Sequence, residues 1–209
     1  MILAGAAATA RQVVAGLPVP PGDSLAFRLL RGGSDIGRHT LSFEPQGDAL
    51  TVRIAVEARV SLLSIPIVHY THHVVETWQD GMLAAIVGET NKNGRIEWVR
   101  ARRTAEGLVV QGSRTQQYIA PEPAIGTSYW NKRMLDGPMI SMEDGVLLHP
   151  KVTALQSEVI PLASGRSVAA AHYNLSGSFN VDVWYDEASR WASLAFTAAD
   201  GSAIHYERL

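Results

Sequence analysis

The chain has no cysteine, little charge and no long apolar run, and each absence removes a class of protein. Without cysteine in its 209 residues, it has no disulfides, thiolate metal sites, cysteine nucleophile or lipid-modified N-terminal cysteine. No apolar run approaches the roughly 18 residues that cross a membrane, so we expect no transmembrane segment. The formal net charge of −2 at pH 7 is unlike the basic balance of nucleic-acid-binding domains, and we expect no nucleic-acid partner.

Sustained helical periodicity is also missing. Short runs of alternating apolar and polar residues are separated instead by Gly, Pro, Asp and Asn, which is typical of antiparallel strands and turns. With 46% hydrophobic and 18% charged residues, the composition suits a globular protein with a core. We predict an all-β fold, a single antiparallel β-barrel or curved half-barrel of about ten strands.

The predicted organisation is a lead-in followed by one β domain. Residues 1–24 are interpreted as an extended N-terminal lead-in or a remnant export segment. Ala8-Thr9-Ala10 has the form of a signal-peptidase site, but the basic leading region and longer apolar stretch of a full signal are missing; an ordinary strand or helix is an equal alternative. Residues 25–209 are predicted as a β-barrel domain with an insertion at 121–150. That insertion is dense in Pro and Gly, and we predict a short helix in it and a lid over one end of the barrel.

Two dipeptides set a register for the central strands. Asp80-Gly81 and Asn93-Gly94 each separate two β-rich runs and favour tight type I′ hairpin turns. Counting back from them places His72 opposite Glu89, and Glu89 opposite Trp98. The side chains predicted to share one face are Tyr70, His72, Glu76, Trp78, Glu89 and Trp98. A one-residue slip at either turn would move these residues to the other face.

His72 and Glu89, with Glu76 nearby, form the candidate catalytic group. A carboxylate beside an imidazole orients the ring and raises its pKa, as general acid–base chemistry requires. The competing interpretation is a structural polar pair inside the barrel. No metal site is predicted, because His69 and His73 lie about 13 Å apart along a strand and His72 points the other way. No cofactor is expected, since no phosphate loop, nucleophile elbow or zinc-binding helix motif occurs.

Aromatic side chains supply the candidate ligand contacts. Several lie on predicted strands, and others lie in the insertion, where binding residues are often carried by loops. The candidate ligand-binding residues are Tyr70, Trp78, Trp98, Tyr129, Trp130, Asn131 and Trp184. For each tryptophan the alternative is a place in the core, and for Tyr129 and Trp130 it is a plug in the open end of the barrel.

A set of short segments carries a family resemblance. They are Ile36-Gly37-x-His39, Tyr70-x-His72-x-x-x-Glu76-x-Trp78-x-x-Gly81-x-Leu83, Thr90-Asn91-Lys92-Asn93-Gly94, Ser128-Tyr129-Trp130-Asn131 and Val183-Trp184-Tyr185-Asp186. Together they resemble an uncharacterised family of exported bacterial all-β proteins, a domain of unknown function, from near Leu25 to the C-terminus. The resemblance implies a curved antiparallel sheet, distantly like lipocalin-like barrels or lipoprotein-carrier half-barrels. It also implies a periplasmic or exported setting, from which the short N-terminus departs, and it brings no activity with it.

Three functions are compatible with these features. The leading hypothesis is the binding of a small apolar or amphipathic molecule inside the barrel, because barrels of this size enclose one ligand. The alternative is a cofactor-independent enzyme, a hydrolase or isomerase, that uses the His–carboxylate pair. The second alternative is a structural envelope protein. Polar residues on the inner face favour a pocket, whereas a filled barrel would carry Val, Ile and Leu there.

Overall fold

The computed structural model describes residues 16–62 and 65–209, and its architecture is all-β. The large sheet is built from β1 (Ser24–Arg31), β2 (Ser34–Gln46), β3 (Ala49–Leu62), β4 (Ile65–Gln79), β5 (Met82–Lys92), β6 (Arg95–Thr104), β7 (Gly107–Gly112), β8 (Thr115–Ala120), β12 (Lys151–Ala154), β13 (Glu158–Pro161), β14 (Ser167–Ser176), β15 (Val181–Asp186), β16 (Trp191–Thr197) and β17 (Ala203–Arg208). A small sheet contains β9 (Ile125–Gly126), β10 (Met139–Ile140) and β11 (Leu147–Leu148), and the 3₁₀ helix η1 spans Lys132–Asp136. The all-β class is confirmed, with more strands than the ten or so predicted.

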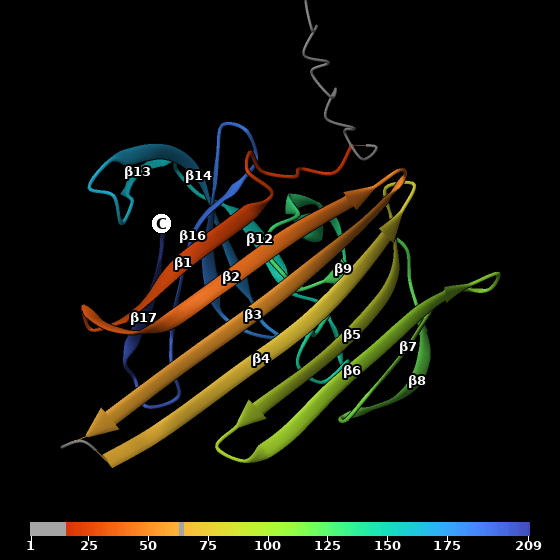
Figure 1. The fold of residues 1–209 in the computed structure, drawn as a ribbon, viewed down its shortest axis with the longest axis horizontal. Helices are drawn as coiled ribbons and strands as arrows, with labels where there is room; N and C mark the ends of the chain where they lie inside the picture. The colour runs from red at the N-terminus through yellow and green to blue at the C-terminus, as the bar shows by residue number, and fades with distance from the viewer. Residues whose placement is uncertain (1–15, 63–64) are drawn as a thin grey trace, which may run out of the picture.

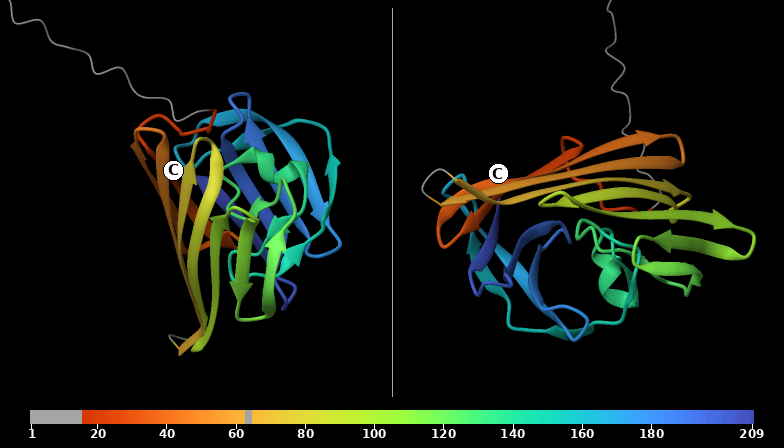
Figure 2. Two further views of the ribbon diagram at one scale, coloured as in Figure 1. Left: turned by 90° about the vertical axis from the view of Figure 1, so that its right-hand side faces the viewer. Right: turned by 90° about the horizontal axis from the view of Figure 1, so that it is seen from below.

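The large sheet is curved and open. Its order runs β12-β14-β15-β16-β17-β1-β2-β3-β4-β5-β6-β7-β8, with β13 also paired to β14. The first strand therefore lies beside the last, while β8 and β12 remain as the two edges. Figure 1 shows the long strands β1 to β6 side by side, and the right-hand view in Figure 2 shows the blue strands of the C-terminal part facing them across the interior. The half-barrel form of the prediction is the one that the chain adopts.

Both predicted hairpin turns are present. The φ angles are 51° at Asp80, 74° at Gly81, 55° at Asn93 and 90° at Gly94. Two successive positive φ values define a type I′ turn, whose twist matches that of the strands it joins. Asp80-Gly81 links β4 to β5 and Asn93-Gly94 links β5 to β6, so the predicted topology of this meander is confirmed.

A third hairpin turn lacks such a signal. The sequence from Leu108 to Tyr118 predicts a single strand, because it is a β-rich run set off by Glu106-Gly107. The structure has two strands there, β7 and β8, which pair across the turn at Ser113-Arg114. Neither turn residue is Gly or Asn, so the run lacks the Asp-Gly and Asn-Gly signals of the other two turns, and Gly112-Ser113 is the weaker turn signal that it carries. The sequence from Val152 to Pro161 likewise predicts one strand, and the structure has two, β12 and β13.

Alternation along the strands gives the sheet a buried and an exposed face. On β3, Val52, Ile54 and Val56 are buried, whereas Arg53 and Glu57, at positions that point to the other face, are exposed. Because successive side chains point to opposite faces, this pattern fixes the inner face of the whole sheet through the register of its neighbours. The main hydrophobic core lies on that inner face.

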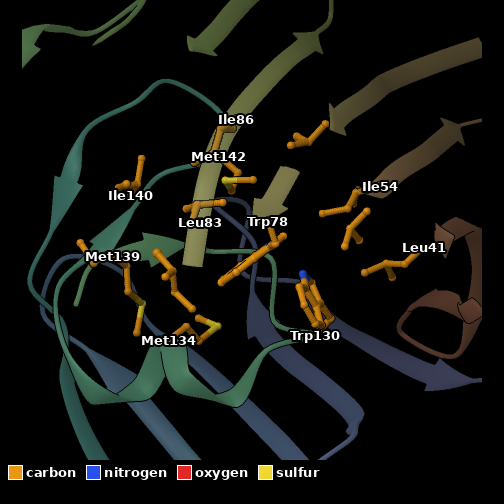
Figure 3. Close-up of a cluster of buried hydrophobic side chains, with 14 of the residues drawn as sticks. Leu41, Ile54, Trp78, Leu83, Ile86, Trp130, Met134, Met139, Ile140 and Met142 are labelled. Atoms are coloured by element: carbon orange, nitrogen blue, oxygen red, sulfur yellow. The ribbon is translucent and has the colours of Figure 1, made fainter. Parts of the chain in front are cut away.

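Residues 121–150 connect the two open edges of the sheet, since they join β8 to β12. They include η1, as predicted. Figure 3 shows Trp130 and Met134 of this segment packed toward Trp78 and Leu83 of the large sheet. Trp130 is 1% exposed, and an aromatic side chain that buries about 150–250 Å² contributes about 4–6 kcal/mol of hydrophobic stabilisation at about 25 cal/mol per Å². Apolar burial therefore holds the segment against the inner face.

The N-terminal lead-in is described only in part. Residues 1–15, which include the predicted signal remnant, lie outside the described residues, and residues 16–23 form no helix or strand. Within the described part of the chain, no helix has the length and apolarity needed to cross a membrane.

Candidate functional site

The hollow side of the sheet contains a cavity of about 700 Å³. Its walls come from β1 to β5, from β15 to β17 and from the segment that joins the sheet edges. Much of the wall is apolar; examples are Leu29, Ile54, Val56, Val68, Phe179 and Leu194. The volume lies within the range of about 300–1,000 Å³ that is usual for small-molecule sites.

A row of inner-face residues brings two histidines into this cavity. His39 on β2 pairs with Val56 on β3, and Val56 pairs with His72 on β4. The row continues from His72 to Thr90 on β5. Because neighbouring strands lie about 4.8 Å apart, the Cα atoms of the two histidines are about 10 Å apart. Both imidazoles line the cavity.

His72 is 7% exposed, and its Nδ1 lies 2.7 Å from the hydroxyl oxygen of Thr90. This hydrogen bond fixes the orientation of the ring. Burial lowers the pKa of His72 to about 4, although the nearby carboxylate of Glu143 acts in the opposite direction. The imidazole is therefore neutral at pH 7 and offers a donor or an acceptor but no charge.

His39 is 5% exposed, and within the described part of the chain neither of its ring nitrogens has a hydrogen-bond partner. Its ring lies edge-on to Trp191 at a centroid distance of 5.0 Å and to Tyr206 at 5.8 Å. Burial lowers the pKa of His39 to about 3, and the second histidine adds to this effect. A buried polar group without a partner costs about 1–3 kcal/mol, so this side chain stands out among those that line the cavity.

Glu143 ties the inner segment, residues 121–150, to the sheet at the edge of the cavity. Its Oε1 accepts a hydrogen bond of 2.8 Å from the Tyr70 hydroxyl, and its Oε2 lies 2.5 Å from the Lys92 ammonium. Tyr70 and Lys92 are paired residues on β4 and β5. The charge of the Glu143 carboxylate is balanced by the Lys92 ammonium. Together these bonds place a phenol, an ammonium and a carboxylate beside the histidines.

The full charges around the cavity are all paired. Four of the described residues that line it are charged: Arg31, Lys92, Glu143 and Asp200. Arg31 forms an ion pair with Asp200, and Lys92 forms one with Glu143 and a second, at 3.3 Å, with the buried Glu97. Together with the neutral histidines, these pairs leave the described lining with no unpaired full charge.

The predicted His72–Glu89 pair is wrong. Trp78 faces Leu83 as predicted, but the register shifts between Thr77 and Trp78, and His72 then pairs with Thr90. The shift is a β-bulge that inserts one extra residue into β5, and such a residue turns the following side chains to the opposite face. Glu89 is exposed on the outer face, beside the exposed His73 to which it is paired.

Glu76 is on the predicted inner face but does not line the cavity. It is 0% exposed, and its Oε2 accepts hydrogen bonds of 2.9 Å from the Trp78 indole and 2.8 Å from the Trp130 indole. Burial raises the pKa of Glu76, against the lowering effect of its hydrogen bonds. This carboxylate joins β4 to the inner segment within the core, which is a structural position.

The predicted ligand-binding residues are divided between three places. Tyr70 and Tyr129 line the cavity, whereas Trp78 and Trp130 are in the core. Asn131 is buried at the start of η1, where its side chain accepts a hydrogen bond from the Arg133 backbone amide. Tyr129 has a φ of 62°, an uncommon conformation for a bulky residue, and it is held by a hydrogen bond from the Tyr185 hydroxyl to its carbonyl oxygen.

Two predicted contacts lie away from the inner face. Trp98 is half-buried opposite Glu89 on the outer face, with the Arg100 guanidinium 5.8 Å from its ring centroid. Trp184 belongs to a separate small cluster that includes Ile160, and it stacks on His172 at 4.3 Å. These two tryptophans therefore do not contribute to the cavity.

Most of the residues that line the cavity were not among the predicted site residues, and four of these carry polar groups that matter for its chemistry. They are His39, Lys92, Glu143 and Tyr206. His39 and Lys92 belong to the segments that carry the family resemblance, which was the available signal. Glu143 and Tyr206 reach the cavity through long-range packing and have no local signal. In the described part of the chain, no group of three or more potential ligands is placed to hold a metal ion.

Comparisons with known proteins agree with the geometry. The family described as "Domain of unknown function (DUF6134)" matches residues 27–209, and the chain belongs to this family. The chain is also similar to a solved structure, a beta-barrel-like protein of domain of unknown function DUF1849 from Brucella abortus, with a TM-score of 0.61 and 10% identity over 89% of this chain and 94% of that one. At that identity the likeness shows the fold alone. No curated protein matches the chain.

Proposed function

We propose that this member of the DUF6134 family binds a small apolar or amphipathic molecule in the cavity on the hollow side of its sheet. The observation that carries the proposal is the cavity itself, about 700 Å³ beside a well-packed core. If the interior served only as a core, filling this volume would stabilise the protein. An empty cavity lowers the free energy of unfolding, because the side chains around it lose packing contacts.

The lining matches an amphipathic occupant. Apolar side chains of β3, such as Ile54 and Val56, form much of the wall, and the polar groups among them include those of His39, His72 and Tyr70. Sites for small molecules typically combine a mostly apolar wall with a few placed polar groups that orient the ligand. An apolar chain and a polar end would both find partners here.

The residues of the enzymatic alternative do not form a histidine–carboxylate pair. Its residues were His72 with Glu89 or Glu76, but Glu89 faces outward and Glu76 is hydrogen-bonded to two buried indoles. Along β4, Glu76 is four residues from His72, about 13 Å at the usual rise. The structural alternative accounts for the core around Trp130 but not for the cavity.

A plug in the cavity tests the proposal. Ala58 lines the cavity, and Ala55, on the same strand, faces outward. The neutral dye N-phenyl-1-naphthylamine should bind the wild-type protein saturably with a rise in fluorescence. Ala58→Phe should weaken that binding about tenfold or more, which corresponds to about 1.4 kcal/mol, while the matched control Ala55→Phe keeps wild-type affinity. An absence of saturable binding, or equal binding by all three proteins, would contradict the proposal.

The setting of this activity is taken from the sequence. The resemblance to exported bacterial proteins, distantly like lipocalin-like barrels or lipoprotein-carrier half-barrels, predicts a periplasmic or exported location and a carrier or sequestering role for the cavity. Fractionation of cells that express the full-length gene product tests the location independently of the binding experiment.

A further inference from the structure

The ring nitrogens of the two histidines that line the cavity favour an amphipathic ligand that can form hydrogen bonds with them. His39 is buried and both of its ring nitrogens lack a partner among the described residues, and His72 uses Nδ1 on Thr90. Both rings line the same cavity wall, about 10 Å apart at Cα. A polar group that reaches His39 would satisfy it, whether it belongs to a ligand or to water, because an unpartnered buried donor or acceptor is destabilising.

The charge balance excludes an ionised end. Arg31 and Asp200 neutralise one another, as do Lys92 and Glu143. An anion would have to break an existing ion pair or protonate a histidine. With a pKa of about 4 for His72, only about one imidazole in three thousand is protonated at pH 7.5. A cation would meet no unpaired carboxylate on the described lining.

We propose that the cavity takes an uncharged amphiphile, a hydrocarbon chain that ends in a hydroxyl-bearing group such as a glycerol ester, and that His39 and His72 bind its hydroxyls. This assignment rests on the proposed function, since it names the ligand class of the same cavity. The apolar chain lies along the wall that contains Ile54 and Val56, and two hydroxyls suit two separated imidazoles better than one does. Tyr129 and Tyr206 line the same region. Burial raises the pKa of each phenol, so both stay protonated and neutral.

Four probes with ten-carbon chains test the head group. Monodecanoylglycerol and methyl decanoate are both uncharged esters of one acid and differ in the two hydroxyls, whereas decanoate and decylammonium each carry a charge. Their affinities are measured at pH 7.5, below micelle-forming concentrations, by displacement of N-phenyl-1-naphthylamine. Monodecanoylglycerol should bind about tenfold or more tightly than each of the other three, because each neutral hydrogen bond contributes several-fold in affinity.

Histidine variants separate recognition from general hydrophobic binding. His39→Phe and His72→Phe keep an aromatic ring and remove the nitrogens, and each should reduce the advantage of monodecanoylglycerol over methyl decanoate by about fivefold. His73→Phe is the matched control, because His73 is adjacent on β4 and exposed on the outer face, and it should leave the ratio unchanged. His39→Gln retains a donor and an acceptor and should restore part of the ratio. Dye affinity and thermal unfolding report whether each variant keeps the cavity.

The outcomes distinguish the two proposals. If no probe displaces the dye and the dye itself binds without saturation, the proposed function fails. If the probes bind but monodecanoylglycerol has no advantage over methyl decanoate, or if decanoate or decylammonium binds as tightly, the head-group assignment is overturned and binding in the cavity stands. The assignment is also overturned if His39→Phe and His72→Phe both preserve the wild-type ratio while retaining dye affinity.

Discussion

The two buried histidines make the free energy of unfolding decrease as the pH falls, and His39→Phe should remove about half of that dependence. Burial lowers the pKa of His39 to about 3 and that of His72 to about 4, whereas an unfolded chain has a histidine pKa of about 6.5. Between these values the unfolded state binds more protons than the folded state. The stabilisation from each neutral ring is therefore complete above about pH 6.5 and is lost as the pH falls through the folded-state pKa.

The magnitude follows from those pKa values. At pH 5 each histidine has lost about 2 kcal/mol of its contribution, because it is almost fully protonated in the unfolded chain and almost neutral in the folded protein. The wild-type protein should thus lose about 4 kcal/mol from this pair between pH 8 and pH 5, a large part of the 5–15 kcal/mol that is typical of a domain. His39→Phe should lose about 2 kcal/mol less than the wild type over the same range. Burial raises the pKa of Glu76, so that group acts in the opposite direction, but it is present in both proteins and cancels.

Urea unfolding followed by tryptophan fluorescence at pH 8, 7, 6 and 5 measures the effect. His73→Phe is the control: His73 is exposed on the adjacent position of β4, and its variant should keep the wild-type pH dependence. Parallel curves of unfolding free energy against pH for the wild type and His39→Phe would refute the reasoning, since they would mean that His39 titrates alike in the folded and unfolded states. A variant that is less stable at every pH but has the shallower slope would still support it.

Three further changes test the structural assignments. Glu76→Met leaves two buried indole N–H groups unpaired and should reduce the free energy of unfolding in urea by about 2–6 kcal/mol, whereas Glu76→Gln keeps an acceptor and should lose less than half of that; equal losses would contradict the bridging role. Glu89→Gln and Trp98→Ala change the outer face and should alter dye affinity less than about twofold; a larger loss would place these residues at the site. Gly112→Ala puts a Cβ 1.9 Å from the Asp144 carbonyl oxygen and should reduce the unfolding free energy by about 1–3 kcal/mol, and unaltered stability would mean that the inner segment can move away.

Local chemistry made the hairpins of the meander predictable. Asp80-Gly81 and Asn93-Gly94 occupy positions that need positive φ, and few other residue pairs meet that need without strain. Alternation of apolar and polar residues from Val52 to Glu57 likewise indicates which side chains of β3 share a face, and one of these faces is buried. The turn at Ser113-Arg114 carries no such signal, and it was missed.

Contacts between distant parts of the chain were beyond the sequence. The pairing of β17 with β1 joins the two ends of the chain, and the inner segment brings Glu143 to Tyr70, 73 residues away. Such contacts depend on how apolar faces pack together, and nothing in a local window of sequence encodes the partner. Much of the polar lining of the cavity comes from these contacts, so the predicted residues in it are only Tyr70 and His72 on β4 and Tyr129 in the inner segment.

The candidate catalytic pair failed because of one extra residue in β5. The turn at Asp80-Gly81 and the pairing of Trp78 with its partner were right, but the bulge that follows inverts the rest of the strand. One pattern indicated the correct face. Trp98, Arg100 and Arg102 occupy every second position of β6 and therefore share one face. Two arginines there indicate an outward face, which the paired Glu89 then shares. The bulge gives His72 a threonine in place of a carboxylate. A neutral imidazole oriented by a hydroxyl is suited to hydrogen-bonding an uncharged group. The extra residue in β5 therefore removes the acid–base pair and, because it places Thr90 beside His72, favours recognition of a polar, unionised ligand.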